Sequence, residues 1–259
     1  MKLFVLLLIA GLSAAAQTAN KGKQVVQDAV EAMGGPKFLS MKNRIEAGRA
    51  FSFYREQVTG LTMATIYTEY LDHIPPKGLG IRERQAFGKK QDYSILFLED
   101  QGYEINYRGA RPVPDERWQK YLKTAGANIF YLMRERLNDP KLSYEFVRSD
   151  VVLNTQVNIV DVADGSDNPI RVYFDVNTKV PLRQESSAWD PVGRGRSTER
   201  TDYSKYRDVN GVQWPYVIHR ERNGEVIYDM FANSVEIDTK IPDKTFDLPS
   251  GIKILKKVD

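Results

Sequence analysis

The chain holds few side chains that could carry out catalytic or metal chemistry. Its 259 residues include two histidines and no cysteine. His73 stands at the end of an extended segment and His219 alternates with Ile218 in another, and neither has a second histidine or an acidic neighbour at ligand spacing. Because a zinc site needs three or four convergent donors, the sequence predicts no metal site. We also expect no cofactor, no thiol catalysis and no disulfide bond.

Two further patterns have both a catalytic and a structural interpretation. Residues 193–198, Gly-Arg-Gly-Arg-Ser-Thr, are similar to a phosphate-binding loop, but they lack the Walker spacing and precede a strand rather than a helix. We interpret them as a hairpin tip. Carboxylates such as Asp175, Asp190 and Asp202 are numerous, yet 27% of the residues are charged, so chance pairs are unavoidable. No Gly-x-Ser-x-Gly elbow is present, and the sequence predicts a protein without catalytic residues that is not an enzyme.

The most distinctive group of side chains is apolar and lies in residues 114–137. The spacing of the apolar residues there becomes helical, with Gly126 between two stripes, which predicts two short helices joined by a hinge. Their large side chains could seal a core or line a cavity, because methionine and aromatic rings suit both. We hypothesise that this insertion forms a lid whose ligand-contacting residues are Trp118, Tyr121, Leu122, Ile129, Phe130 and Met133.

A large antiparallel sheet must position these helices. Six strand-like segments follow one another from Val157 to about Ile237, joined by short turns. Two of the turns are Asn210-Gly211 and Asn223-Gly224, the dipeptide that tolerates the positive φ angles of a tight hairpin. The other turns are expected at 164–169, 177–179 and 190–193, earlier extended segments at 45–53, 63–73, 81–87, 93–98, 103–107 and 142–148, and a helix at 21–33. The sequence therefore predicts a mainly β fold with some helix (α+β).

The amino terminus has the pattern of a secretory signal peptide. Lys2 precedes an apolar stretch from Leu3 to Leu12, and small residues at 14 and 16 suit signal peptidase. The stretch is shorter than the roughly 20 apolar residues of a spanning helix, and no cysteine follows for lipid attachment. We expect cleavage near Ala16/Gln17, and a single periplasmic domain over residues 17–259 without a transmembrane segment. The formal net charge of +3 is too small to indicate a nucleic-acid partner.

Three sequence motifs resemble those of a known family. The first helix ends in Met33-Gly34-Gly35, residues 203–215 read Tyr-Ser-Lys-Tyr-Arg-Asp-Val-Asn-Gly-Val-Gln-Trp-Pro, and residues 241–249 read Ile-Pro-Asp-Lys-Thr-Phe-Asp-Leu-Pro. In this order, with a helical insertion between strands, the chain resembles a longer branch of the bacterial outer-membrane lipoprotein-sorting, or lipoprotein-carrier (LolA-like), superfamily. The resemblance implies a strongly bent sheet, an unclosed barrel, whose concave side is capped by helices. It also implies acyl chains of a lipid or lipoprotein as the cargo, and a partner protein at the inner or outer membrane.

Three functions follow as hypotheses. The first is an exported carrier or binding protein that shields acyl chains, without catalysis. The second is an envelope hydrolase with a carboxylate pair in the concave face. The third is an envelope sensor or interaction module whose cavity is filled by its own side chains.

Overall fold

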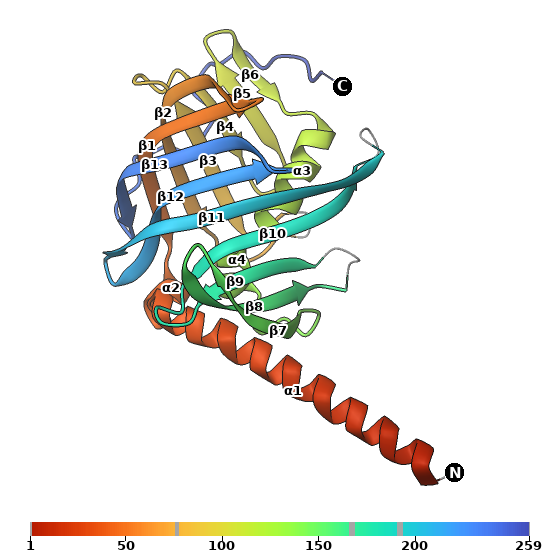
Figure 1. Cartoon of the computed structure of the whole chain (residues 1–259). Coiled ribbons are helices and arrows are strands. Elements are labelled where there is room, and N and C mark those ends of the chain that lie inside the picture. Colours follow the sequence, from red (N-terminus) through yellow and green to blue (C-terminus); the bar gives the residue numbers. More distant parts are fainter. Residues whose placement is uncertain (1, 76–77, 166–168, 191–193, 259) are drawn as a thin grey trace.

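The structure is a computed structural model that describes residues 2–75, 78–165, 169–190 and 194–258. Within these residues the chain forms four helices and one antiparallel sheet of 13 strands, which bends without closing into a barrel (Figure 1). This confirms the predicted fold class. Residues 166–168 and 191–193, which belong to two of the predicted turns, lie outside the described residues.

The helices lie at the start of the chain and in one insertion between strands. They are α1 (Lys2–Met33), α2 (Pro36–Ser40), α3 (Asp115–Gly126) and α4 (Ile129–Glu135). The strands before the insertion are β1 (Asn43–Tyr54), β2 (Gln57–Tyr70), β3 (Ile81–Phe87), β4 (Tyr93–Phe97), β5 (Gly102–Asn106) and β6 (Gly109–Pro112). Those after it are β7 (Ser143–Val152), β8 (Thr155–Ala163), β9 (Ile170–Asp175), β10 (Pro181–Asp190), β11 (Gly195–Val209), β12 (Val212–Arg222) and β13 (Glu225–Ile237).

The strand order explains why helices cross the concave side of the sheet. Strands β1 to β6 run outward in sequence to one edge, and strands β7 to β13 run inward from the opposite edge. The two halves meet where β1 pairs with β13. The chain must therefore pass from the edge strand β6 to the edge strand β7, and α3 and α4 make this passage inside the bend (Figure 1).

The two Asn-Gly turns have the predicted conformation. In Asn210-Gly211 the φ angles are 56° and 84°, and in Asn223-Gly224 they are 53° and 82°. Positive φ at both central residues is the signature of the type I′ turn, so this prediction is confirmed. Arg55-Glu56 and Leu153-Asn154 close hairpins in the same way, with φ angles between 49° and 61°. They contain no glycine, and the sequence did not predict them as tight turns.

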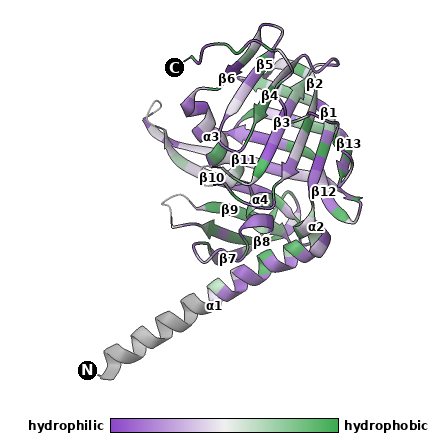
Figure 2. Cartoon of the chain, turned by 180° about the vertical axis from the view of Figure 1, so that it is seen from behind, coloured by the Kyte–Doolittle hydropathy of each residue, from purple (hydrophilic) through white to green (hydrophobic). Residues whose placement is uncertain are grey.

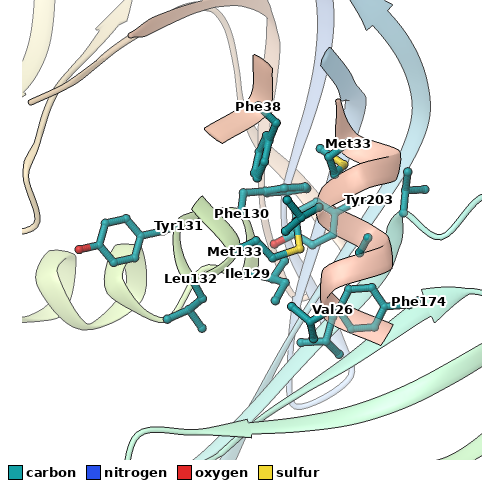
Figure 3. Close-up of a cluster of buried hydrophobic side chains, with 14 of the residues drawn as sticks. Val26, Met33, Phe38, Ile129, Phe130, Tyr131, Leu132, Met133, Phe174 and Tyr203 are labelled. Atoms are coloured by element: carbon teal, nitrogen blue, oxygen red, sulfur yellow. The ribbon is translucent and has the colours of Figure 1, made fainter. Parts of the chain in front are cut away.

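The main core lies between α1, α4 and the sheet (Figure 3). The apolar stripe expected on the first helix is confirmed, since Val26, Ala29, Val30 and Met33 are each no more than 2% exposed. They meet Ile129 and Met133 of α4, which are fully buried. The insertion thus contributes directly to the core of the protein.

Helix α1 begins at Lys2 rather than near residue 21, because the apolar leader continues the same helix. Its described carboxyl-terminal part, which carries both hydrophilic and hydrophobic residues (Figure 2), packs on the edge strand β7. Gly22 permits this approach, because a Cβ atom there would lie 2.7 Å from the carbonyl oxygen of Tyr144. No helix in the described part of the chain is long and apolar enough to cross a membrane.

The carboxyl-terminal segment covers the other edge of the sheet. The backbone N–H of Ala110 in β6 donates to the carbonyl of Lys253 at 2.9 Å, and Leu255 donates to the carbonyl of Ala110 at 2.8 Å. Phe246, Leu248 and Ile252 pack beside them on a cluster around Leu96. Both ends of the chain therefore protect an edge strand from pairing with another chain.

Candidate functional site

A cavity of about 360 Å³ lies between the concave face of the sheet and the two inserted helices. Strands β1, β2 and β3 form one wall, β10 to β13 form the other, and α3 and α4 lie against them. We call this space the sheet cavity. Its volume falls at the lower end of the range of about 300–1,000 Å³ that is typical of small-molecule sites.

The lining of the sheet cavity combines apolar and polar groups. Its apolar side chains come from both walls and from α4, and they include Ile66, Ile81, Phe87, Phe130, Ile218 and Met230. Arginines and glutamates on β1, β3 and β12 share the same space. The cavity is therefore amphipathic rather than purely apolar.

One polar cluster on the wall is built around Arg44 and Glu46, which lie two residues apart on β1 and so face the same side. The Nε atom of Arg44 donates to Glu46 at 2.9 Å, and their side chains are 11% and 8% exposed. The indole N–H of Trp214 donates to the other oxygen of Glu46 at 2.7 Å, and the Arg44 guanidinium lies over the indole ring. Arg44 also donates to the Tyr70 hydroxyl at 2.7 Å. Burial alone would lower the pKa of Arg44, but Glu46 holds it above the usual value.

Glu83 of β3 is a second carboxylate in the wall. Burial raises the pKa of Glu83, although the hydrogen bond from Gln85 at 2.6 Å and the charge of Arg44 act in the opposite direction. A carboxyl group with a raised pKa holds its proton to higher pH than one in water. The protonation of Glu83 therefore depends on the environment inside the cavity.

The joint between α3 and α4 is attached to the sheet at several points. Gln184 of β10 accepts from the backbone N–H of Ile129 at 2.9 Å and donates to the carbonyl of Ala127 at 2.9 Å. Asn128 caps α4 by accepting from the N–H of Phe130 at 2.9 Å, and its amide donates to the Tyr203 hydroxyl. Helix α4 is therefore fixed at its start, whereas α3 has one buried residue, Trp118.

The six residues proposed from sequence as the ligand-contacting set lie in four places. Tyr121 and Phe130 line the sheet cavity. Trp118 packs with Phe97 in a separate cluster on β4, whereas Ile129 and Met133 lie in the main core. Leu122 lines a second space, described next.

A second cleft of about 1,020 Å³ lies on the other side of α4 and is bounded by β8, β9 and the segment around Leu79. We call it the lower cleft. Tyr131 of α4 lines both spaces, and its hydroxyl donates to the carbonyl of Leu79 at 3.0 Å. In Figure 3 the ring of Tyr131 points away from the buried cluster of the core. The Tyr131 side chain therefore lies where the two spaces approach each other.

His219 has carboxylate neighbours that the sequence did not suggest. Its Nδ1 atom lies 2.6 Å from Asp229 of β13, and its Nε2 atom lies 3.0 Å from Glu221. Burial would lower the pKa of His219, but these two carboxylates raise it above the usual value.

The other histidine, His73, is exposed, and no group of three or more potential metal ligands occurs in the part of the chain that the structure describes.

The functional candidates that sequence reasoning missed are Arg44, Glu46, Glu83 and Arg220. The spacing of Arg44 and Glu46 was a usable signal, since charges at i and i+2 of a strand share one face. Arg220 gave no such signal, because its surroundings come from β11 and β13 through strand register.

Comparisons with known proteins identify the fold. No family model matches the sequence, and no curated protein matches it either. Among solved structures, a DUF1329 family protein from Desulfovibrio piger has a TM-score of 0.61 at 10% identity, over 89% of this chain and 97% of that chain. A domain from Vibrio parahaemolyticus described as an outer membrane lipoprotein-sorting protein has a TM-score of 0.60 at 9% identity, over 88% of this chain and 97% of that chain. A LolA superfamily protein from Nitrosomonas europaea has a TM-score of 0.52 at 10% identity, over 87% of this chain and 97% of that chain. At such identities the likeness establishes the fold, and it agrees with the family resemblance in the sequence.

Proposed function

We propose that this protein is an exported periplasmic carrier or binding protein that holds acyl chains of a lipid or lipoprotein in the sheet cavity. The observation that carries the proposal is a partly apolar space of about 360 Å³ on the concave side of a bent sheet. The names of two structural neighbours, one a lipoprotein-sorting domain and one a LolA superfamily protein, support it further. Release of residues 1–16 as a signal peptide remains part of this proposal.

Helix α3 is our proposed lid. It covers the cavity with Tyr121, Thr124 and Ala125, and Trp118 is its one buried residue. It packs on the sheet through the small aromatic cluster with Phe97 and through the ion pair of Arg117 with Glu104 of β5. Helix α4 carries five consecutive buried residues, so its movement would expose core side chains at much greater cost. We therefore place the entrance of the ligand at α3.

The test is ligand binding with and without a blocked cavity. Organic extracts of the purified protein would be examined by mass spectrometry, and binding of a fluorescent fatty-acyl probe would be titrated. Ala125→Phe adds a ring to the cavity lining and should reduce binding at least about tenfold, which corresponds to about 1.4 kcal/mol. Gln119→Phe adds the same ring to an exposed position of the same helix and is the matched control.

Two outcomes would contradict the proposal. The first is a wild-type protein that carries no extracted lipid and binds no probe, which favours a sensor or interaction module. The second is equal binding by the Ala125→Phe variant and the wild type, which places the probe elsewhere.

A hydrolase is the second candidate, because Glu46 and Glu83 both line the same cavity and paired carboxylates are the usual acid and base of glycoside hydrolysis. It predicts turnover of glycosides or acyl esters that Glu83→Gln abolishes. Turnover that the variant retains, or no turnover at all, would reject this candidate.

A further inference from the structure

Arg220 is the arginine of the sheet cavity whose charge has no carboxylate partner among the described residues. The cavity wall contains two arginines, Arg44 and Arg220. Arg44 is neutralised by Glu46 at 2.9 Å. No ion pair within 4.0 Å joins Arg220 to an acidic side chain in the described ranges. A half-buried cation without a counter-ion is costly unless another group satisfies it.

Strand register explains the missing partner. Arg220 of β12 lies opposite Thr201 of β11 and opposite Tyr228 of β13, and all three line the cavity. Its near neighbour Arg222 instead lies opposite Glu199 and pairs with it at 2.7 Å. The same strand therefore places one arginine against a carboxylate outside the cavity lining and one against two hydroxyl groups within it.

The hydroxyl groups beside Arg220 are available as neutral donors. Burial raises the pKa of Tyr228 to about 12, so its hydroxyl keeps its proton at physiological pH. An arginine and adjacent hydroxyl donors form the usual arrangement for a carboxylate or phosphate oxygen. The acidic side chains that face the same cavity are Glu46 and Glu83. Glu46 is held by Arg44, and the pKa of Glu83 is raised by burial, so neither cancels the charge of Arg220 in full.

Apolar side chains lie two residues along β12 and β13 from Arg220 and Tyr228. Ile218 lies opposite Met230 and both face the cavity, and Phe87 packs against the same cluster. The wall thus changes from charged to apolar within two residues of β12. A space of about 360 Å³ suits one ligand of modest size, since drug-sized ligands occupy pockets of about 300–1,000 Å³.

We propose that the ligand of the sheet cavity is a single-chain amphiphile with an anionic head group, which binds Arg220, Thr201 and Tyr228 while its acyl chain lies along Ile218, Met230 and Phe87. This inference rests on the proposed carrier function and specifies its ligand class. A fatty-acid carboxylate and a monoalkyl phosphate share the required chemistry.

The test compares oleate, oleyl phosphate and the neutral oleyl alcohol as competitors of the neutral fluorescent probe N-phenyl-1-naphthylamine. The wild-type protein should bind at least one anion about 10- to 100-fold more tightly than the alcohol, as expected for charge-assisted hydrogen bonds. Arg220→Met should remove this preference while leaving the affinity for oleyl alcohol within about threefold. Arg220→Lys should retain part of the preference. Arg222→Met, which removes the paired arginine on the same strand, is the matched control and should retain all of it.

The outcomes separate the two proposals. Equal affinity of the wild type for the alcohol and both anions overturns anion recognition, while the carrier function stands. A preference that persists in Arg220→Met also overturns it. Binding of none of the three ligands overturns the carrier function and this inference together. The wild-type comparison needs no variant, so it decides the question even if Arg220→Met does not fold. The ratio between oleate and oleyl phosphate then identifies the head group.

Discussion

Replacing Glu46 with alanine should strongly destabilise the protein, because it leaves Arg44 charged and without its counter-ion inside the bent sheet. The Arg44 side chain is 11% exposed, and Glu46 is its ion-pair partner at 2.9 Å. The indole N–H of Trp214 would lose its acceptor at 2.7 Å as well. Removing one partner of a buried pair costs about 3–5 kcal/mol. For a domain of this size that corresponds to a fall in melting temperature of about 6–20 °C.

Two variants divide this cost into its parts. Glu46→Gln keeps an acceptor for one of the two donors and loses the charge, so we expect a smaller cost of about 1–3 kcal/mol. Arg44→Met combined with Glu46→Met removes both charges, and it should cost less than the sum of the single changes because the two residues are in contact. Glu199→Ala, in a half-exposed pair with Arg222, is the control and should cost less than about 1 kcal/mol.

The assay is urea unfolding followed by tryptophan fluorescence and by circular dichroism. The slope of the free energy against urea should stay constant across the variants, so that the midpoints report stability alone. A cost below about 1 kcal/mol for Glu46→Ala, or single-variant costs that add without coupling, would refute the reasoning.

Three further predictions concern other parts of the molecule. The Tyr121 hydroxyl is buried without a hydrogen-bond partner among the described residues, so Tyr121→Phe should leave the melting temperature unchanged or raise it, and a clear fall would reveal a partner. His219→Gln should lower the free energy of unfolding more at about pH 5.5 than at about pH 8.5. The pKa of His219 is raised in the folded protein, so its charged form stabilises the fold fully below the unfolded pKa of about 6.5, and this stabilisation is lost as the pH rises through the folded pKa. Asp229→Asn should flatten the same dependence, and parallel pH curves for wild type and His219→Gln would contradict it. Gly22→Val should cost about 1–3 kcal/mol in urea unfolding, because its side chain would meet the Tyr144 carbonyl, and an unchanged midpoint would show that α1 does not dock there.

The sheet could be predicted because its signals are local. Alternation of side chains and the two Asn-Gly turns lie within a few residues of each other, and the structure has six strands from β8 to β13 where six were expected. Arg55-Glu56 and Leu153-Asn154 turn as tightly without glycine, so composition could not reveal them. The four-residue strand β6 was also missed. It pairs with β5 across a two-residue turn, and its other side is held by a carboxyl-terminal segment about 140 residues away, for which no local signal exists.

The site was harder to predict, because its groups meet only through the topology. Glu46 and Trp214 are 168 residues apart, and they touch because β1 pairs with β13, which pairs with β12. The question of core or cavity for the insertion also depended on topology. Helices α3 and α4 carry the chain from the edge strand β6 to the edge strand β7 across the concave side. This path places Met133 of α4 in the main core and Tyr121 of α3 beside the sheet cavity.

The seam between β1 and β13 has a consequence for folding. Residues 43–54 pair with residues 225–237, so the last long-range contacts of the sheet must wait until nearly the whole chain has been synthesised and has emerged. Topologies with such distant contacts fold slowly. Until the seam forms, each half-sheet presents an unpaired inner strand, and these are the surfaces on which two newly made chains would pair with each other instead. Aggregation during production should therefore depend on β1 and β13, which lie in the middle of the finished sheet.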